Sequence, residues 1–217
     1  EQGSWAVAFD GSDVGITGDV DAFAFLDNDT LLLSLEAPAT LPDIGQVDDS
    51  DIIQFIPTQL GSVTVGHFAW YLDGSDVGLN TDEEDIDAID FTRDGRLVIS
   101  PSNGFAVEAL KGRDEDLFVL NNASFGQESG GEWAMYFDGS YVAVSTGRDI
   151  NGAWIDPDNG DIYLSTNGAY TVAGLSGDED DIFICTPSAL GTETACTFRA
   201  FWNGDAVGFG QERLDGI

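Results

Sequence analysis

The sequence has very few basic residues. Its 217 residues include 7 Lys and Arg against 40 Asp and Glu, so the formal net charge is −33. Lys111 is the only lysine. Nucleic acids and anionic membranes are bound through basic side chains that neutralise phosphate. The composition therefore argues against a nucleic-acid partner and against binding to an anionic membrane surface.

Residues with specialised chemistry are also scarce. The chain has one histidine, His67, and two cysteines, Cys185 and Cys196, without the Cys/His clustering of a zinc site. It contains no G-x-S-x-G elbow, phosphate-binding loop or dinucleotide fingerprint. His67 lies at a position taken by Thr197 in a later repeat, which indicates a structural or surface role rather than a general base. We therefore expect no enzymatic activity.

Long apolar runs and helical periodicity are absent as well. No stretch approaches the ~20 apolar residues that a membrane-spanning helix needs, so we expect no membrane insertion. The hydrophobic fraction of 42% is nevertheless enough for a buried core, and 27 glycines supply turns. These features predict an all-β globular protein.

The same pattern occurs several times along the chain. Aligning Asp10, Asp73, Asp138 and Asn203 gives spacings of 63, 65 and 65 residues. Further columns contain Asp19, Asp85, Asp149 and Arg213, then Asp21, Asp87, Asn151 and Asp215, and then Ser34, Ser100 and Ser165. A fixed period indicates a repeat architecture. We interpret residues 1–217 as one repeat domain with units at about 19–80, 85–145 and 149–210 and part-units at 1–18 and 211–217.

Each unit is predicted to form a four-stranded antiparallel sheet. In the second unit, residues 85–91 and 96–100 alternate around an Asp/Gly turn, which is a hairpin signal. A third strand begins at Asp116, and a fourth leads into Asp138. Alternate residues of the fourth strands are apolar, which predicts a buried face. These residues are Trp5, Val7, Phe9, Phe68, Trp70, Leu72, Trp133, Met135, Phe137, Phe198, Ala200 and Trp202.

Two segments resemble a known family. "TRDGRLVIS" (residues 92–100) and "DPDNGDIYLS" (residues 156–165) resemble the first hairpin of a blade in β-propeller-like repeat proteins. The type that they resemble is the acidic, secreted prokaryotic repeat protein with about 65 residues per unit. The resemblance implies a propeller-like arrangement of the three units with extra terminal strands, and implies nothing about activity. A pseudo-threefold prism or trefoil is the alternative arrangement.

Both ends of the chain resemble parts of a unit. Residues 4–10 match a fourth strand, and residues 214–217 match the start of a first strand. The two ends could meet as a thin fourth blade, or the amino-terminal strand could lie on an edge of a prism or trefoil. Alternatively, an end could pair with another subunit, and such head-to-tail contacts between identical chains grow a fibre.

Acidic residues gather before the first and third strands of the units. The candidate metal ligands are Asp19, Asp21, Asp49, Asp51, Asp85, Asp87, Asp114, Asp116, Asp178, Asp180 and Asp181. Two aspartates at i and i+2 of a strand lie about 7 Å apart on one face and repel each other unless a cation lies between them. Ca²⁺, which takes six to eight oxygen ligands, is the expected cofactor. The alternative is a solvated acidic surface suited to high salt.

The two cysteines are predicted to form a disulfide. Cys185 and Cys196 fall on the third and fourth strands of the last unit and face each other across their hairpin. A disulfide indicates an oxidising compartment. We therefore expect a secreted protein, extracellular or at the cell surface.

The expected function is structural. The sequence favours a non-enzymatic, calcium-binding subunit of a surface layer, matrix or fibre that self-associates through its terminal strands. The alternative is a polysaccharide-binding module, or a polysaccharide-active propeller enzyme, that uses a cleft between units.

Overall fold

The protein consists of three four-stranded antiparallel sheets with smaller two-stranded sheets. The computed structural model describes residues 4–26, 29–81, 83–144, 148–210 and 212–217. Within these ranges there is no α-helix, and the only helical segments are short 3-10 turns. The predicted all-β fold is confirmed.

Each large sheet is a meander with the strands in chain order. The first contains β1 (Val20–Phe25), β2 (Leu31–Leu35), β5 (Ile52–Gln59) and β6 (Val65–Leu72). The second contains β7 (Ile86–Phe91), β8 (Leu97–Pro101), β11 (Leu117–Ser124) and β12 (Gly130–Phe137). The third contains β13 (Gly152–Ile155), β14 (Ile162–Ser165), β17 (Asp181–Ala189) and β18 (Ala195–Asn203).

Each unit also contains a small hairpin and a 3-10 turn that the sequence analysis missed. The hairpins lie between the second and third strands: β3 (Ala39–Leu41) with β4 (Gly45–Val47), β9 (Gly104–Val107) with β10 (Leu110–Arg113), and β15 (Tyr170–Val172) with β16 (Leu175–Gly177). The 3-10 turns are η1 (Gly11–Val14), η2 (Gly74–Val77), η3 (Ser140–Val142) and η4 (Asp205–Val207). They explain the Asp10 column, because the Asp10 and Asp73 side chains accept from the N–H groups of Ser12 and Ser75 and cap η1 and η2.

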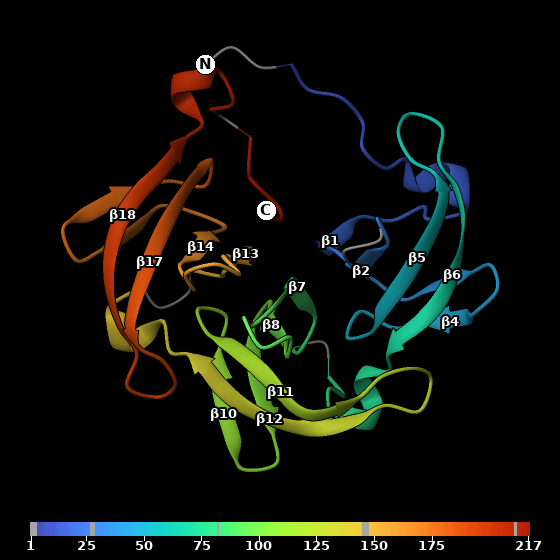
Figure 1. Ribbon diagram of the computed structural model, residues 1–217, viewed down its shortest axis with the longest axis horizontal. Helices are drawn as coiled ribbons and strands as arrows, with labels where there is room; N and C mark the ends of the chain where they lie inside the picture. The colour runs from blue at the N-terminus through green and yellow to red at the C-terminus, as the bar shows by residue number, and fades with distance from the viewer. Residues whose placement is uncertain (1–3, 27–28, 82, 145–147, 211) are drawn as a thin grey trace.

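The three sheets are arranged around a common axis in a propeller-like manner (Figure 1). The first strands β1, β7 and β13 lie nearest the centre, and β7 contacts both β1 and β13. One hydrophobic cluster joins the first and second units through residues such as Leu32 and Phe118. Another joins the second and third units through residues such as Phe137 and Phe183. Burial of apolar side chains between neighbouring sheets therefore stabilises the arrangement.

Neighbouring units are also joined by hydrogen bonds that we call the turn contact. The Tyr71 carbonyl at the end of β6 accepts from the Gly126 N–H at 2.8 Å, and the Asp73 N–H donates to Ser129 Oγ at 3.0 Å. Gly126 and Ser129 lie in the turn between β11 and β12 of the next unit. The same pattern joins the second and third units, where Asp138 N–H donates to Thr194 Oγ1 at 2.9 Å.

The amino-terminal segment makes this same turn contact onto the first unit. The Ala8 carbonyl accepts from the Gly61 N–H at 2.9 Å, and the Asp10 N–H donates to Thr64 Oγ1 at 2.9 Å. The segment thus takes the place of a fourth strand. It differs from the expected terminal strand, however, since residues 4–10 belong to no sheet and Trp5 is 80% exposed.

The carboxy-terminal segment takes the place of a first strand after the third unit. Leu214 N–H donates to the Glu179 carbonyl at 3.0 Å, as Ile150 N–H donates to the Asp114 carbonyl at 2.9 Å. Residues 212–217 are likewise outside any sheet. The two ends approach each other, because the rings of Trp5 and Phe209 lie 5.5 Å apart between centroids. The described amino-terminal residues from Ser4 onward and the carboxy-terminal segment therefore lie between the third and first units (Figure 1).

The predicted disulfide is present between Cys185 and Cys196, on β17 and β18. It supports an oxidising compartment. Within the described ranges, none of the helical segments has the length and apolar character of a membrane-spanning helix. In the second unit the equivalent positions hold Leu120 and Gly131, and the Leu120 side chain packs closely against this glycine. The disulfide takes the place of this packing contact in the third unit.

We expect reduction of this disulfide to lower the free energy of unfolding by about 2–3 kcal/mol, since it closes a short loop in the unfolded chain. The cysteines are 11 residues apart in sequence. Urea unfolding with and without reductant measures the effect. The double substitution Cys185→Leu with Cys196→Gly, which copies Leu120 and Gly131, should fold and should be insensitive to reductant. If reductant lowered the free energy of unfolding of this variant as much as that of the wild type, the effect would not come from the disulfide, and the account would be contradicted.

Candidate metal centre

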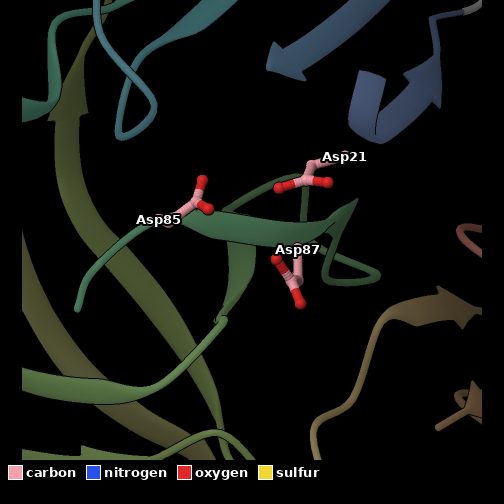
Figure 2. A group of neighbouring side chains, drawn as sticks. All are labelled: Asp21, Asp85 and Asp87. Carbon is pink, nitrogen blue, oxygen red and sulfur yellow. The ribbon is translucent and has the colours of Figure 1, made fainter. Parts of the chain in front are cut away.

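Three aspartates from two units, Asp21, Asp85 and Asp87, converge at the axis of the molecule. We call this group the axial centre. Asp21 belongs to β1, Asp87 to β7, and Asp85 immediately precedes β7. One carboxylate oxygen of each lies within 4.8 Å of one oxygen of each of the others. In the view of Figure 2, Asp85 lies at the start of β7, and Asp21 and Asp87 lie on opposite sides of this strand. All three are among the ligands predicted from the sequence.

Irregular strand pairing helps to place these side chains. The register shifts between Val20 and Ala22 in β1 and between Ile86 and Ala88 in β7, so Asp21 and Asp87 are the extra residues of two bulges. A bulge redirects a side chain from the simple alternation of a strand. The side chain of Ile86 is fully buried, and its N–H donates to the Asp49 carbonyl at 3.4 Å, which fixes the start of β7.

The third unit and the carboxy-terminal segment contribute polar groups that the sequence analysis did not assign. The Asp149 carboxylate lies near that of Asp87, and each of these two side chains shifts the pKa of the other. Asn151 Nδ2 donates to the Leu214 carbonyl at 2.7 Å and to Asp215 Oδ1 at 3.3 Å. Asp149 occupies the same repeat column as Asp85, and Asn151 the same column as Asp87. This alignment is the sequence signal that could have identified them.

Burial and mutual repulsion raise the pKa values of these acids. Desolvation comes first, followed by the neighbouring carboxylates, and together they raise the pKa of Asp21 to about 7 and that of Asp85 to about 9. Desolvation and the adjacent Asp87 raise the pKa of Asp149 to about 10. At neutral pH the centre therefore needs either protons or a cation to offset its charge.

Several oxygen atoms at the centre have no hydrogen-bond donor among the described residues. They are Oδ1 of Asp85, Oδ1 of Asp149 and Oδ1 of Asn151. Asp149 is 6% exposed and Asn151 is 1% exposed. Buried oxygens without a donor are costly, and a hard divalent cation bound by the three aspartates would satisfy the one on Asp85. The convergent donors are carboxylate oxygens, which fit Ca²⁺.

Comparison with known proteins identifies no relative. No family model matches the chain, and no curated protein or solved structure matches it. A functional interpretation of this centre therefore rests on its geometry.

Three further predicted ligands lie near the first strands but outside the close group. Asp49 and Asp114 accept backbone hydrogen bonds through their carbonyls, from Ile86 and Ile150. The charge of Asp49 contributes to the raised pKa of Asp85, and that of Asp114 to the raised pKa of Asp149. Asp19 is exposed, and its carbonyl accepts from the Glu36 N–H at 3.3 Å. The structure brings neither Asp19, Asp49 nor Asp114 into a described metal-sized group.

Asp51 and Asp116 bind backbone groups. Asp51 Oδ2 accepts from Asp48 N–H at 2.7 Å, and its Oδ1 accepts from Gly74 N–H at 2.9 Å. Asp116 makes the equivalent bonds to Arg113 and Gly139, both at 2.9 Å. These carboxylates join the turn before the third strand to the following 3-10 turn. The remaining predicted residues, Asp178, Asp180 and Asp181, form a second close group in the third unit.

Proposed function

We propose that the protein is a secreted, non-enzymatic structural protein whose units are held together by Ca²⁺ at the axial centre. The observation that carries this proposal is the convergence of Asp21, Asp85 and Asp87, from two units, on one point. Asp149 extends the centre into the third unit through Asp87. A cation bound here would contact two neighbouring units at once. Its binding free energy would therefore stabilise the arrangement of the three sheets.

Other features support a structural role. The centre is built from the starts of the innermost strands, whose positions decide how the sheets meet (Figure 1). The single histidine, His67, is exposed on β6 and paired with Ile56, which agrees with a surface position rather than a catalytic one. The disulfide supports an extracellular setting, where Ca²⁺ is available to a site of modest affinity.

Calcium should raise the melting temperature of the wild-type protein. Saturation at about 100 times the Kd adds about 2.7 kcal/mol, which for a chain of this size corresponds to roughly 5–10 °C. Asp85→Asn should weaken Ca²⁺ binding by at least about 10-fold, because it removes a charged ligand from the centre. Asp19→Asn is the matched control, since Asp19 occupies the same repeat column but is exposed. An unchanged calcium response in Asp85→Asn would contradict the proposal.

The outer edge of the third unit supports self-association. Phe201 and Asn203 end β18 at the positions of Tyr71 and Asp73, yet among the described residues no following turn makes the turn contact with them. Phe201 is 57% exposed. We propose that this edge joins the Gly61–Thr64 turn of a second copy, head to tail, by the same hydrogen bonds. Residues 8–13 of that second copy occupy its turn and must first be displaced.

Deletion of residues 1–10 should therefore promote association, because it frees Gly61 and Thr64. Light scattering after size exclusion at micromolar concentration should show a mainly monomeric wild-type protein and larger species for the deletion. Adding Phe201→Asp to the deletion should restore the monomer by placing a charge on the docking edge. A deletion variant that remains monomeric, or that associates equally with Phe201→Asp, would contradict head-to-tail exchange.

Polysaccharide binding is the second candidate function. A cavity of about 610 Å³ is lined by residues of all three sheets, and Phe25, Trp154 and Phe201 are on its lining. The ring centroids of Trp154 and Tyr163 lie 4.8 Å apart, and those of Tyr163 and Phe201 lie 4.9 Å apart. The rings pack edge to face, and the exposed face of a single ring, such as that of Trp154, is a surface on which a sugar can stack. A sugar-dependent change in tryptophan fluorescence, lost in Trp154→Ala, would favour this candidate over self-association.

A further inference from the structure

We propose a second, independent cation site in the third unit, formed by Asp178, Asp180 and Asp181 with help from Asp205. The site takes a hard divalent cation of the Ca²⁺ class. It lies in the turn between β16 and β17 and is separate from the axial centre. A cation there would tie this turn to η4, the last 3-10 turn before the carboxy-terminal segment.

The three carboxylates converge and are poorly solvated. Within the group, one oxygen of each residue lies within 4.8 Å of one oxygen of each of the others. Asp180 is 3% exposed and Asp181 is 7% exposed, and Asp178 is half-buried. Asp180 Oδ2 is buried without a hydrogen-bond donor among the described residues. A buried acceptor aimed into a group of like charges points to a missing positive partner.

The equivalent turns of the other units hold fewer convergent carboxylates. In the first unit, Ser50 occupies the position of Asp180, and its hydroxyl donates to the Leu79 carbonyl at 3.4 Å. In the second unit, Arg113 occupies the position of Asp178 and brings a positive charge. The third unit has an acidic residue at both positions. All three turns are acidic, but among the described residues only the third-unit turn brings three carboxylates together within reach of one ion.

A fourth carboxylate approaches from η4. Asp205 and Asp180 both lie against Gly210, since a Cβ atom on that glycine would meet oxygens of both side chains. The charge of Asp205 adds to the raised pKa values of Asp180 and Asp181. The neighbouring Asp178 carboxylate, followed by desolvation, raises the pKa of Asp180 to about 6. The three convergent carboxylates and the neighbouring Asp205 therefore offer oxygen ligands of the kind that Ca²⁺ prefers.

Tyr170 borders the same group. A Cβ atom on Gly177 would meet both the Tyr170 hydroxyl and Asp181 Oδ2, so these two atoms lie near each other. The Tyr170 ring stacks on Phe183 with centroids 4.1 Å apart, as Phe105 stacks on Phe118 in the second unit at 3.8 Å. The third unit therefore keeps the aromatic stack and adds a hydroxyl beside the carboxylates. Burial, together with Asp181 and Asp178, raises the pKa of Tyr170 to about 12.

Calorimetric titration of the full chain with CaCl₂ tests the second site. The wild type should bind two ions, and Asp180→Ser, which copies Ser50 of the first unit, should bind one. Asp205→Asn should weaken that same ion by at least about 10-fold, because it removes one charged ligand. Far-ultraviolet circular dichroism and a calcium-free melting temperature no lower than that of the wild type establish that Asp180→Ser is folded.

The axial variant Asp85→Asn separates this proposal from the proposed function. Loss of one ion in Asp85→Asn and of the other in Asp180→Ser supports both sites. An unchanged ion count in Asp180→Ser overturns the second site and leaves the axial one standing. An unchanged count in Asp85→Asn, with loss in Asp180→Ser, overturns the axial site and supports the second. A wild type that binds no Ca²⁺ overturns both.

Discussion

In the presence of a chelator, the melting temperature should fall by roughly 5–10 °C between pH 5 and pH 8, as about 2–3 kcal/mol of stability is lost. The axial centre is the cause. Its acids have raised pKa values, about 7 for Asp21 and about 9 for Asp85. The folded protein therefore holds protons that the unfolded chain has already released.

The direction of this effect follows from proton linkage. An unfolded aspartate has a pKa of about 3.9, so the folded state binds more protons across the interval up to the raised values. The stabilising protons are fully bound below about pH 4 and are lost as the pH rises through about 7 and about 9. Asp21 is partly exposed, so solvent screening reduces its share and the expected loss is well below the full shift.

Calcium should abolish most of this pH dependence, because the cation replaces the protons. The measurement is thermal unfolding from pH 5 to pH 8, with chelator and with millimolar CaCl₂. Asp85→Asn removes one titrating group and should flatten the profile in chelator. A wild-type melting temperature that rises with pH in chelator, or that responds identically with and without Ca²⁺, would be inconsistent with the axial centre.

Gly74→Ala should lower the free energy of unfolding by about 3 kcal/mol, and thus the melting temperature by roughly 6–12 °C. A Cβ atom at this position would overlap the carbonyl oxygen of Ser50 and lie 2.9 Å from its carbonyl carbon. The Gly74 N–H also donates to Asp51 Oδ1 at 2.9 Å. The backbone cannot move away from Ser50 without weakening that hydrogen bond. The turn before β5 and η2 would therefore separate.

Gly18→Ala is the matched control for this substitution. A Cβ atom on Gly18 would have nothing within 4 Å, and its backbone is not left-handed. It should change stability by no more than about 0.5 kcal/mol. Chemical unfolding of both variants in CaCl₂ compares them under conditions where the axial centre is satisfied. Equal stabilities for Gly74→Ala and Gly18→Ala would show that the close approach at Ser50 is relieved at little cost.

The repeat made much of the fold predictable. The Asp10 column and the alternating strands predict the three four-stranded sheets, and the repeat places Cys185 and Cys196 on one hairpin, where the structure has their disulfide. The signal was strong because each unit buries the same strand faces between sheets. The prediction of a buried face was wrong for Trp5, Val7 and Ala200, which are exposed. Trp5 and Val7 share the pattern, but residues 4–10 belong to no sheet.

The functional residues were harder to predict, since identical aspartates have different roles. Asp51 and Asp87 both occur in acidic stretches, yet Asp51 accepts two backbone N–H groups and Asp87 lies at the axis. The difference arises from a bulge in β7 and from contacts between units, and neither leaves a local signature in the sequence. Asn151 was missed because an amide breaks the acidic pattern while keeping the oxygen.

The central claim is that a divalent cation binds where the innermost strands meet. Anomalous diffraction from crystals grown with terbium, a calcium substitute, locates such an ion directly. We predict a strong peak about 2.3–2.6 Å from carboxylate oxygens of Asp21, Asp85 and Asp87. A map with peaks only at exposed surface carboxylates, and none at these three residues, would contradict the account.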